Sequence, residues 1–438
     1  MAKIGIIGAG IKGLTTAYKQ ELLGNESYIF EQSNRLGGAL ISKHHDSGYL
    51  TEDGAHTLLL NSIELERFIH SFESLKSSLV ESNPTTKNRF ILKNNHLYPI
   101  QPTPTSILTS NLLPIKSRYK IISEIFKKPT IRNSDLSLRD FFIEHFDEAF
   151  TDYLINPFIA GTYAGNPKHL SAKNTFPNLL DYEKQYGSIL KGLIRNKSSF
   201  KNKIISFKNG LSELPAAIAA KLKNKPILES QILNISKENN RWKIHFKKNE
   251  ESTSSLWHFD ELYCTLPAFQ ISQLPFDDSI KKDCPKFECI EHPPVSVLSL
   301  GYHKSEIQHP LNGFGYLIPE VENKNYLGGL FTSKIFPNRA PKDHELLTFF
   351  IGGSRSPESA SLDTDKLIHK LSPSLSKLLG INSKPRFIYQ RFWGQSIPQY
   401  NLGHSQFLNT ITDFEKKYEN FFFVGNYKEG ISLSQSIL

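Results

Sequence analysis

Cysteine is scarce in this chain, and long apolar runs are missing. The 438 residues include three cysteines, Cys264, Cys284 and Cys289. This odd and sparse set argues against a disulfide framework and against a zinc site, so we expect ordinary thiols and no bound metal. No run of about eighteen apolar residues is present, and no apolar leader precedes the first predicted strand. Neither a membrane-spanning helix nor a signal peptide is predicted, and the expected location is the cytoplasm.

The composition is that of a globular protein with a basic surface. Hydrophobic residues make up 39% and charged residues 22%, which is typical of a chain with a packed core. The formal net charge is +9, so an anionic partner is expected, such as nucleic acid, an anionic membrane or an acidic substrate. The positive charges are scattered and no nucleic-acid-binding motif is found. We therefore favour a membrane surface or an acidic substrate and predict no nucleic-acid partner.

The first thirty residues carry a dinucleotide-binding pattern. An apolar strand at 3–7 runs into the GxGxxG sequence of residues 8–13, which opens a predicted helix over 11–23 and precedes a strand over 27–31. The first glycine permits the tight turn, the second lets the backbone approach a diphosphate, and the third lets helix and strand pack closely. Free N–H groups at the helix start would face the phosphates. The predicted cofactor-binding residues here are Gly8, Gly10, Ile11, Gly13 and Leu14.

A second group of residues favours FAD over a nicotinamide cofactor. Glu31 ends the second strand, where a carboxylate accepts hydrogen bonds from ribose hydroxyls and repels a 2′-phosphate, so NADP is disfavoured. Residues 31–38 resemble the second dinucleotide signature of the amine-oxidase-like flavoproteins. The resemblance implies cofactor contacts from Glu31, Gln32, Arg35, Gly37 and Gly38. Only one such βαβ unit is found, so we infer that electrons leave the flavin for oxygen or a quinone.

The remaining sequence resembles the oxygen-dependent protoporphyrinogen oxidases nearly from end to end. The most specific stretch is residues 156–167, which reads Asn-Pro-Phe-Ile-Ala-Gly-Thr-Tyr-Ala-Gly-Asn-Pro. Further matches lie at residues 313–319, 336–340, 397–400, 423–427 and 430–433. Each could be an ordinary loop or strand end, but their order and spacing together are hard to explain by chance.

This resemblance implies an α/β (α+β) fold with a discontinuous cofactor domain. A Rossmann-like FAD-binding domain would be assembled from residues 1–85, 205–275 and 385–438. A substrate domain of mixed sheet and helices, residues 86–204 and 276–384, would be inserted between these pieces. The family's cofactor contacts fall here on Ile232 at the adenine side, and on Gly425, Gly430, Ile431 and Ser432 at the pyrophosphate and flavin side.

The resemblance also implies the residues of a substrate site. A porphyrinogen is a large apolar macrocycle with ionised propionates, so its site needs apolar walls and a cation. Arg89 matches the arginine that pairs with a propionate, a task suited to a guanidinium because it can bind a carboxylate bidentately. Gly161 and Thr162 match a loop whose main chain approaches the substrate. The apolar walls would be Phe314, Leu317, Leu330 and Phe350.

We therefore predict FAD-dependent oxidation of protoporphyrinogen IX to protoporphyrin IX in haem biosynthesis, with oxygen as the electron acceptor. A flavin can take a hydride from a meso carbon without a protein nucleophile, and the sequence offers no firm general base. The alternatives are a coproporphyrinogen III oxidase, another amine-oxidase-like flavoenzyme, and a non-catalytic protein like the GDP-dissociation inhibitors. Further predicted partners are a second copy of the chain and a ferrochelatase that would receive the product.

A basic amphipathic segment points to a membrane surface. In residues 115–132 the apolar side chains of Ile115, Tyr119, Ile122 and Phe126 recur at helical spacing among lysines and arginines. This pattern fits a helix that lies on the cytoplasmic face of the inner membrane, within a helical part at about 100–200. It fits equally a helix that faces the core with a solvated basic side.

Several local expectations remain to be compared with the structure. Residues 56–80 are predicted to be helical, 88–100 to form a hairpin with a turn at Asn94 and Asn95, and 101–114 to form a loop. Residues 52–56 match the family's turn before the flavin only loosely. Residue 438 falls inside the family's final helix, so we expect weaker FAD binding or lower stability.

Overall fold

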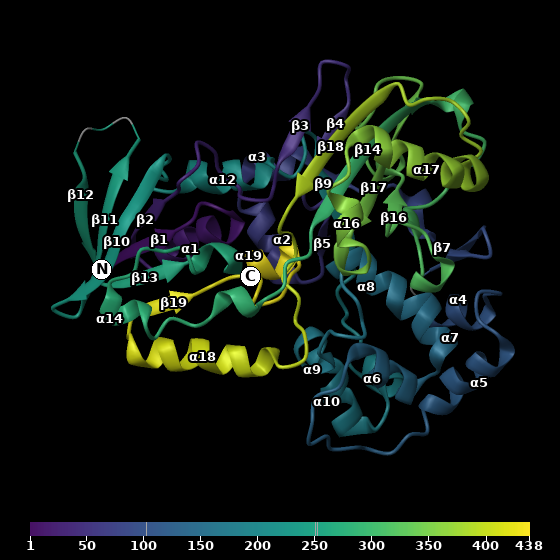
Figure 1. The fold of residues 1–438 in the computed structure, drawn as a ribbon, viewed down its shortest axis with the longest axis horizontal. Coiled ribbons are helices and arrows are strands. Elements are labelled where there is room, and N and C mark those ends of the chain that lie inside the picture. The colour runs from purple at the N-terminus through teal and green to yellow at the C-terminus, as the bar shows by residue number, and fades with distance from the viewer. Residues whose placement is uncertain (102, 250, 252) are drawn as a thin grey trace.

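The structure is a computed structural model that describes residues 1–101, 103–249, 251 and 253–438 (Figure 1). It is a mixed α/β fold with separate parallel and antiparallel sheets, as predicted. In Figure 1 the parallel sheet lies on the left, a seven-stranded sheet lies at the upper right, and a group of helices lies at the lower right.

The parallel sheet is assembled from distant parts of the chain. Its strand order is β19-β13-β1-β2, and all three strand pairs are parallel. The strands are β1 (Lys3–Ile7), β2 (Glu26–Phe30), β13 (Glu261–Cys264) and β19 (Phe421–Phe423). The expected Rossmann-like sheet built from discontinuous segments is therefore present.

Helices cover both faces of this sheet. Ile4 and Ile6 of β1 are fully buried in a cluster that includes side chains of the helices on one face. These helices are α1 (Ile11–Leu22), α12 (Glu213–Lys221) and α19 (Leu433–Ile437). On the other side, Leu262 and Cys264 pack in a cluster with the apolar side of α18 (His404–Lys417) and with a small antiparallel sheet. That sheet consists of β10 (Ser230–Glu238), β11 (Arg241–Lys248) and β12 (Ser255–Phe259).

The second large element is a seven-stranded sheet with the order β18-β14-β17-β16-β15-β7-β8. Its strands are β7 (Arg89–Lys93), β8 (His96–Ile100), β14 (Val295–His303), β15 (Gly315–Leu317), β16 (Gly328–Leu330), β17 (His344–Gly352) and β18 (Phe387–Trp393). Leu298, Leu300 and Phe349 point to one face, which packs against α17 (Thr364–Leu379). The opposite face carries the predicted substrate residues.

Helices between β8 and β9 form a third group. They are α4 (Pro104–Thr109), α5 (Ile115–Glu124), α6 (Leu138–His145), α7 (Glu148–Phe150), a π-helical turn at Thr151–Ile155, α8 (Asn156–Tyr163), α9 (Ala172–Thr175), α10 (Pro177–Tyr186) and α11 (Ile189–Arg195). Phe141 and Ile159 are fully buried in their shared core, and Leu138 and Leu170 are buried beside them. No helix among the described residues is long and apolar enough to cross a membrane.

Two small sheets and several short helices complete the fold. The strands are β3 (Ser42–His44), β4 (Leu50–Glu52), β5 (Leu58–Leu60), β6 (Leu79–Glu81) and β9 (Lys203–Phe207). The short helices are α13 (Ala268–Ile271), α14 (Asp278–Lys281), α15 (Thr332–Ile335) and α16 (Pro357–Ala360).

Two local predictions were wrong. Residues 56–80 are not all helical, because Leu58–Leu60 pairs with β9 as strand β5 before Ser62 caps α2 (Ile63–His70), which α3 (Glu73–Ser78) follows. Within the predicted loop 101–114, Thr103 caps α4 by accepting a hydrogen bond from the N–H of Ser106. Residue 102 of that loop lies outside the described residues.

The predicted hairpin at residues 88–100 is present. Asn94 and Asn95 join β7 to β8, and both have positive φ angles, as a tight two-residue turn requires. The amphipathic segment at residues 115–132 is helical only in its first part, as α5, which ends at Glu124. The predicted domain boundaries stay predictions.

Candidate active site

The predicted cofactor loop joins β1 to α1 and leaves open space above one glycine. A Cβ added at Gly10 would meet only Cα of Gly38, at 4.0 Å. A Cβ at Gly13, in contrast, would lie 2.0 Å from the carbonyl oxygen of Gly8. Close packing of the chain is therefore enough to explain the glycine at this position. Gly10 precedes the first turn of α1 without any side chain capping the helix. The loop therefore offers unblocked backbone beside a helix N-terminus, the surroundings in which a diphosphate binds.

Glu31 is held beside this loop by its own hydrogen bonds. Its Oε2 accepts from the backbone N–H of Ala9 at 2.8 Å, and its Oε1 accepts from the N–H and the hydroxyl of Ser33. The backbone of residues 227–230 pairs with the end of β2, so β10 and Ile232 begin next to Glu31. A bulge at Leu233 follows Ile232 in the β10–β11 ladder. Glu31 and Ile232 thus lie on one side of the predicted adenine and ribose position.

The paired glycines meet the first loop from the opposite side. Gly37 forms a bridge with Gly10, and its N–H donates to the carbonyl of Ala9 at 2.9 Å. Gly37 and Gly38 both have positive φ, so side chains would be strained there. Gln32 and Arg35 are exposed nearby, and the Arg35 guanidinium donates to the carbonyl of Leu36.

The C-terminal turn reaches the same region. Lys12 of α1 lies 2.8 Å from Glu429, which places the turn at residues 430–432 beside the first turn of α1. Ser432 caps α19, and the N–H of Gly430 donates to the hydroxyl of Tyr400 at 3.0 Å. Three remote segments of the chain therefore converge on the predicted cofactor position.

Two of the predicted cofactor residues have a packing explanation of their own. Leu14 is fully buried in the core under α1, so its side chain faces away from the loop. A Cβ at Gly425 would lie 2.6 Å from the ring of Tyr427. Any contact of these residues with a cofactor would involve the main chain.

The predicted substrate walls lie together on the seven-stranded sheet. Phe314, Leu317, Leu330 and Phe350 are all partly exposed, whereas the alternate residues Tyr316 and Phe349 are buried on the opposite face. Leu317 is in register with Gly328, and Gly328 with Phe350, so two of the walls share one row across the sheet. Apolar side chains that stay half-exposed in a row can line a binding surface.

Gly161 and Thr162, which were predicted to lie in a loop, lie in the last turn of the helix α8 instead. This turn and the predicted cation lie at the far edge of the surface. Gly161 in α8 packs so closely on Leu317 that an added Cβ would lie 2.6 Å from Cδ2. Thr162 is exposed and donates its hydroxyl hydrogen to the carbonyl of Phe158. The Arg89 guanidinium stacks on the ring of Phe314, 4.7 Å from its centroid, and burial lowers the pKa of Arg89. It remains cationic, with one long hydrogen bond of 3.5 Å to the carbonyl of Lys87.

His56 was missed by the sequence reasoning. The turn at residues 53–56 packs on the segment just after the paired glycines, because a Cβ at Gly54 would lie 2.2 Å from the carbonyl oxygen of Ala39. Nδ1 of His56 donates to the carbonyl of Gly54 at 3.0 Å, and the ring meets Phe350 edge to face at 5.3 Å. Burial lowers the pKa of His56 to about 4, so the imidazole is neutral at pH 7. A lone histidine in a loosely matching turn carries no sequence signal for this position.

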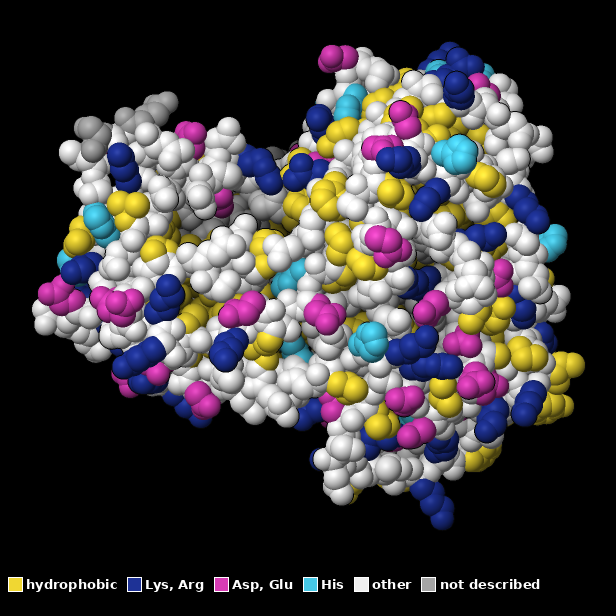
Figure 2. Space-filling model, in the orientation of Figure 1, with side chains coloured by type: hydrophobic (Ala, Val, Ile, Leu, Met, Phe, Trp, Pro, Cys, Tyr) yellow, Lys and Arg dark blue, Asp and Glu magenta, His cyan; other side chains and the backbone are white. Residues whose placement is uncertain are grey.

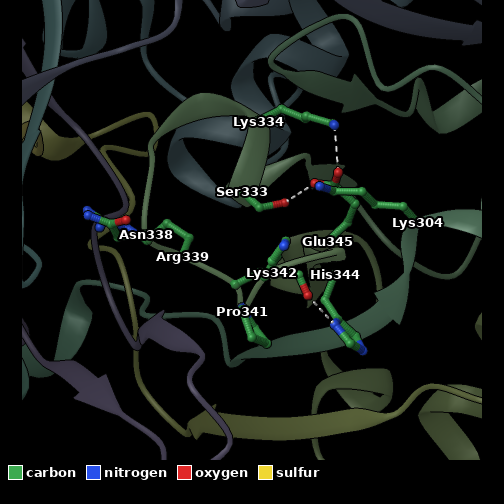
Figure 3. A pocket seen from close by; sticks show the side chains of 10 residues that line it. Lys304, Ser333, Lys334, Asn338, Arg339, Pro341, Lys342, His344 and Glu345 are labelled. Carbon is green, nitrogen blue, oxygen red and sulfur yellow. Dashed lines mark hydrogen bonds and ion pairs between the residues drawn. The ribbon is translucent and has the colours of Figure 1, made fainter.

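The space-filling view shows a hollow on one face of the molecule. The surface is hollowed between the part that carries β10–β12 and the part that carries β3, β4 and β18 (Figure 2). A separate depression of about 260 Å³ is polar and is lined by residues around Lys334, Lys342 and Glu345 (Figure 3). Lys334 is paired with Glu345 there at 2.6 Å, and none of the predicted cofactor or substrate residues lines this depression.

The comparison with known families decides the class of protein. Residues 13–431 match the family described as flavin containing amine oxidoreductase. The chain belongs to this family. Its enzymes carry FAD, and the open backbone above Gly10, the fixed Glu31 and the paired glycines fit that cofactor. The predictions of an FAD-dependent oxidoreductase and of FAD as the cofactor are confirmed, whereas the individual cofactor and substrate contacts stay predictions.

Within this flavoprotein family, the resemblance noted in the sequence is confirmed. Protoporphyrinogen oxidase 2 of Arabidopsis thaliana is 31% identical over 472 residues, covering 99% of this chain and 91% of the relative. Coproporphyrinogen III oxidase of Staphylococcus aureus is 26% identical, covering 93% of this chain and 90% of the relative. A crystal structure from Exiguobacterium sp. 255-15, assigned as a protoporphyrinogen oxidase, shares the fold with a TM-score of 0.80 at 21% identity, covering 100% of this chain and 96% of that one.

Proposed function

We propose that this flavoenzyme oxidises protoporphyrinogen IX to protoporphyrin IX, with oxygen as the electron acceptor, as a step of haem biosynthesis. The observation that carries the proposal is the face of the seven-stranded sheet, which carries four partly exposed apolar side chains and the Arg89 cation stacked on one of them, Phe314. This combination suits a flat apolar ring with a carboxylate at its edge. The similarity to protoporphyrinogen oxidases over nearly the whole chain supports the same substrate class.

In this proposal the chain orients the macrocycle and the cofactor supplies the redox chemistry. FAD, held at the loop of Gly10 and Glu31, would supply the chemistry that removes a hydride from a meso carbon of the substrate. Arg89 binds one propionate, and the walls at Leu317 and Phe350 exclude water from the faces of the ring. Three such oxidations convert the porphyrinogen to the porphyrin. His56 meets Phe350 and is neutral, so it adds no positive charge beside the predicted apolar walls.

A fluorescence assay tests this function, because porphyrins fluoresce and porphyrinogens do not. The purified yellow protein is mixed aerobically with protoporphyrinogen IX, and porphyrin fluorescence and hydrogen peroxide are followed together. We expect fluorescence to rise faster than in a control with a flavin-free Gly10→Val variant. Equal rates in the two samples would contradict the proposal.

Coproporphyrinogen III is the second candidate substrate, supported by the similarity to the Staphylococcus aureus enzyme. It carries four carboxylates where protoporphyrinogen IX carries two. The same assay with this substrate compares the two directly through their kcat/KM values.

Membrane contact through α5 is part of the proposal. The apolar stripe does not face the core: Tyr119 is 70% and Phe126 79% exposed, and Ile115 and Ile122 are exposed with them. Hydrophobic and basic side chains lie side by side over this part of the molecule (Figure 2). Such a helix can lie at an anionic membrane surface, where each nearby cation contributes about 1 kcal/mol. The homodimer and the transfer of product to a ferrochelatase stay predictions.

A further inference from the structure

The face of the seven-stranded sheet that carries the predicted substrate walls has a second arginine at its other end. Register pairs link Arg391 of β18 to Val297, Val297 to Phe350, Phe350 to Gly328, Gly328 to Leu317, and Leu317 to Ile91. Side chains of residues directly opposite each other point to the same face of a sheet. Arg391 therefore shares the face of Phe350 and Leu317. Arg89 lies two residues before Ile91 and shares it too.

The two arginines are alike in their surroundings. The Arg89 guanidinium stacks on Phe314 at 4.7 Å, and that of Arg391 stacks on Trp393 at 4.5 Å. Among the residues that the structure describes, Nε of Arg391 is buried without a hydrogen-bond partner. Asp53 lies 3.8 Å from this nitrogen, too far for a hydrogen bond, although it balances part of the charge.

Asp53 is held in place by hydrogen bonds to other residues and makes none to the Arg391 guanidinium. Oδ1 of Asp53 accepts from the hydroxyl of Tyr389 at 2.8 Å, and its carbonyl accepts from the indole N–H of Trp393 at 2.8 Å. The side chain of Arg391 is 39% exposed and is held by the stacking. The planar Arg391 guanidinium is fixed by stacking and has N–H groups available to donate, so it suits a carboxylate ligand.

We propose that Arg391 is a second carboxylate-binding residue of the substrate site, opposite Arg89. Five strand spacings separate β18 from β7, which is roughly 24 Å between backbones, so the two cations lie toward opposite ends of the face. A macrocycle whose propionates all lie on one side contacts just one end of this face. One with a carboxylate on every ring engages both ends. The site therefore accepts the tetracarboxylate coproporphyrinogen III, and Arg391 determines how well.

This inference rests on the proposed porphyrinogen oxidase function, and kinetics with both substrates test it. Arg391→Gln is expected to lower kcat/KM for coproporphyrinogen III by roughly tenfold to a hundredfold, the range for a lost charged hydrogen bond. The value for protoporphyrinogen IX should change less than about twofold. Arg391→Lys should restore part of the loss, because the charge returns without the planar fork. Arg241→Gln is the matched control, since Arg241 is 46% exposed and also lies beside an aspartate, Asp260, but on remote β11.

A binding measurement gives a readout that does not depend on turnover. Coproporphyrin III and protoporphyrin IX are titrated into each flavin-loaded variant, and FAD content is measured by absorbance. We expect Arg391→Gln to weaken the affinity for coproporphyrin III alone and to keep its FAD.

Three results would overturn the inference: wild-type protein that oxidises only protoporphyrinogen IX, an equal loss for both substrates in Arg391→Gln, or a lowered FAD affinity in that variant. Wild-type protein that oxidises neither substrate would instead refute the proposed function. In that case equal coproporphyrin affinity of wild type and Arg391→Gln would refute the role of Arg391 as well.

Discussion

Gly10 and Gly13 of the cofactor loop differ in what an added side chain would meet. Substitutions at these two positions therefore distinguish an effect on FAD binding from an effect on folding. We predict that Gly10→Val folds normally but does not retain FAD, because its side chain would enter open space where the diphosphate binds. Gly13→Ala should instead destabilise the protein, because its Cβ would lie 2.0 Å from the carbonyl oxygen of Gly8. Flavin absorbance and thermal unfolding, measured on both variants, distinguish the two effects. A Gly10→Val protein with a full flavin spectrum would refute the assignment of this loop.

The stacked cation at the edge of the substrate face gives a second prediction. Arg89→Ala should keep FAD and lower kcat/KM for porphyrinogen by roughly tenfold to a hundredfold, as expected for a charge-assisted hydrogen bond of about 1.5 to 3 kcal/mol. Lysine should restore only part of the activity. Steady-state kinetics on flavin-loaded protein measure this, with Arg241→Gln as the control. Unchanged kinetics in Arg89→Ala would make Arg89 an ordinary surface arginine.

At the scale of elements, a buried glutamate joins α5 to its neighbours. Glu124 is fully buried and accepts hydrogen bonds from Nδ1 of His145, the hydroxyl of Ser188 and the N–H groups of Ile189 and Leu190. Burial alone would raise the pKa of Glu124, but these hydrogen bonds outweigh it and hold the pKa below its usual 4.5. The helices α5, α6 and α11 are thus tied through one carboxylate.

Removing this carboxylate should be costly and should change the response to acid. We predict that Glu124→Ala lowers the free energy of unfolding by about 3 to 5 kcal/mol, because buried partners lose their acceptor. A depressed pKa in the folded state stabilises the fold above pH 4.5, and this part is lost as the pH falls below that value. Urea unfolding at neutral and acidic pH checks both effects. A variant that loses as much stability in acid as the wild type would show that Glu124 is not the group responsible.

The exposed stripe of α5 gives a prediction about membranes. The double variant Tyr119→Ser/Phe126→Ser should bind anionic vesicles less well without losing thermal stability, because both side chains are exposed in the folded protein. Co-sedimentation with vesicles measures the binding. Leu256→Ser is a matched control on β12, where Leu256 is 48% exposed. Equal binding of wild type to neutral and anionic vesicles would remove the electrostatic part of the claim, and unchanged binding of the double variant would remove α5 from it.

Sequence patterns predicted some elements well and others poorly, for physical reasons. The strand-glycine-helix start and the Asn94–Asn95 turn depend on local backbone rules, and both were predicted from the sequence. Leu58–Leu60 is a strand because β9 pairs with it from 145 positions along the chain, which a local pattern does not contain. The same holds for Arg391, whose side chain joins the substrate face only through the register of β18 with β14.

At the scale of the whole molecule, the cofactor joins segments that are remote in sequence. The predicted FAD contacts come from the first forty residues, from Ile232, and from the turn at 425–432, so bound FAD should stabilise the assembly as a unit. We predict that free FAD at a hundred times its Kd raises the free energy of unfolding by about 2.7 kcal/mol. Thermal unfolding with and without FAD measures this in the wild type. Gly10→Val is the control and should show no such gain; equal stabilisation of both proteins would indicate binding elsewhere.

The strand order of the parallel sheet also determines when, during translation, this sheet can be completed. β1 and β2 leave the ribosome before the other two strands of this sheet, and β19 follows the end of β2 only after about 390 further residues, from Phe30 to Phe421. At roughly 5 to 20 residues per second, the first two strands wait roughly twenty to eighty seconds for that edge. The turn at 425–432 emerges later still. The nucleotide loop of a growing chain therefore stays incomplete until β19 and this turn have been made, and we expect FAD to be captured only after that.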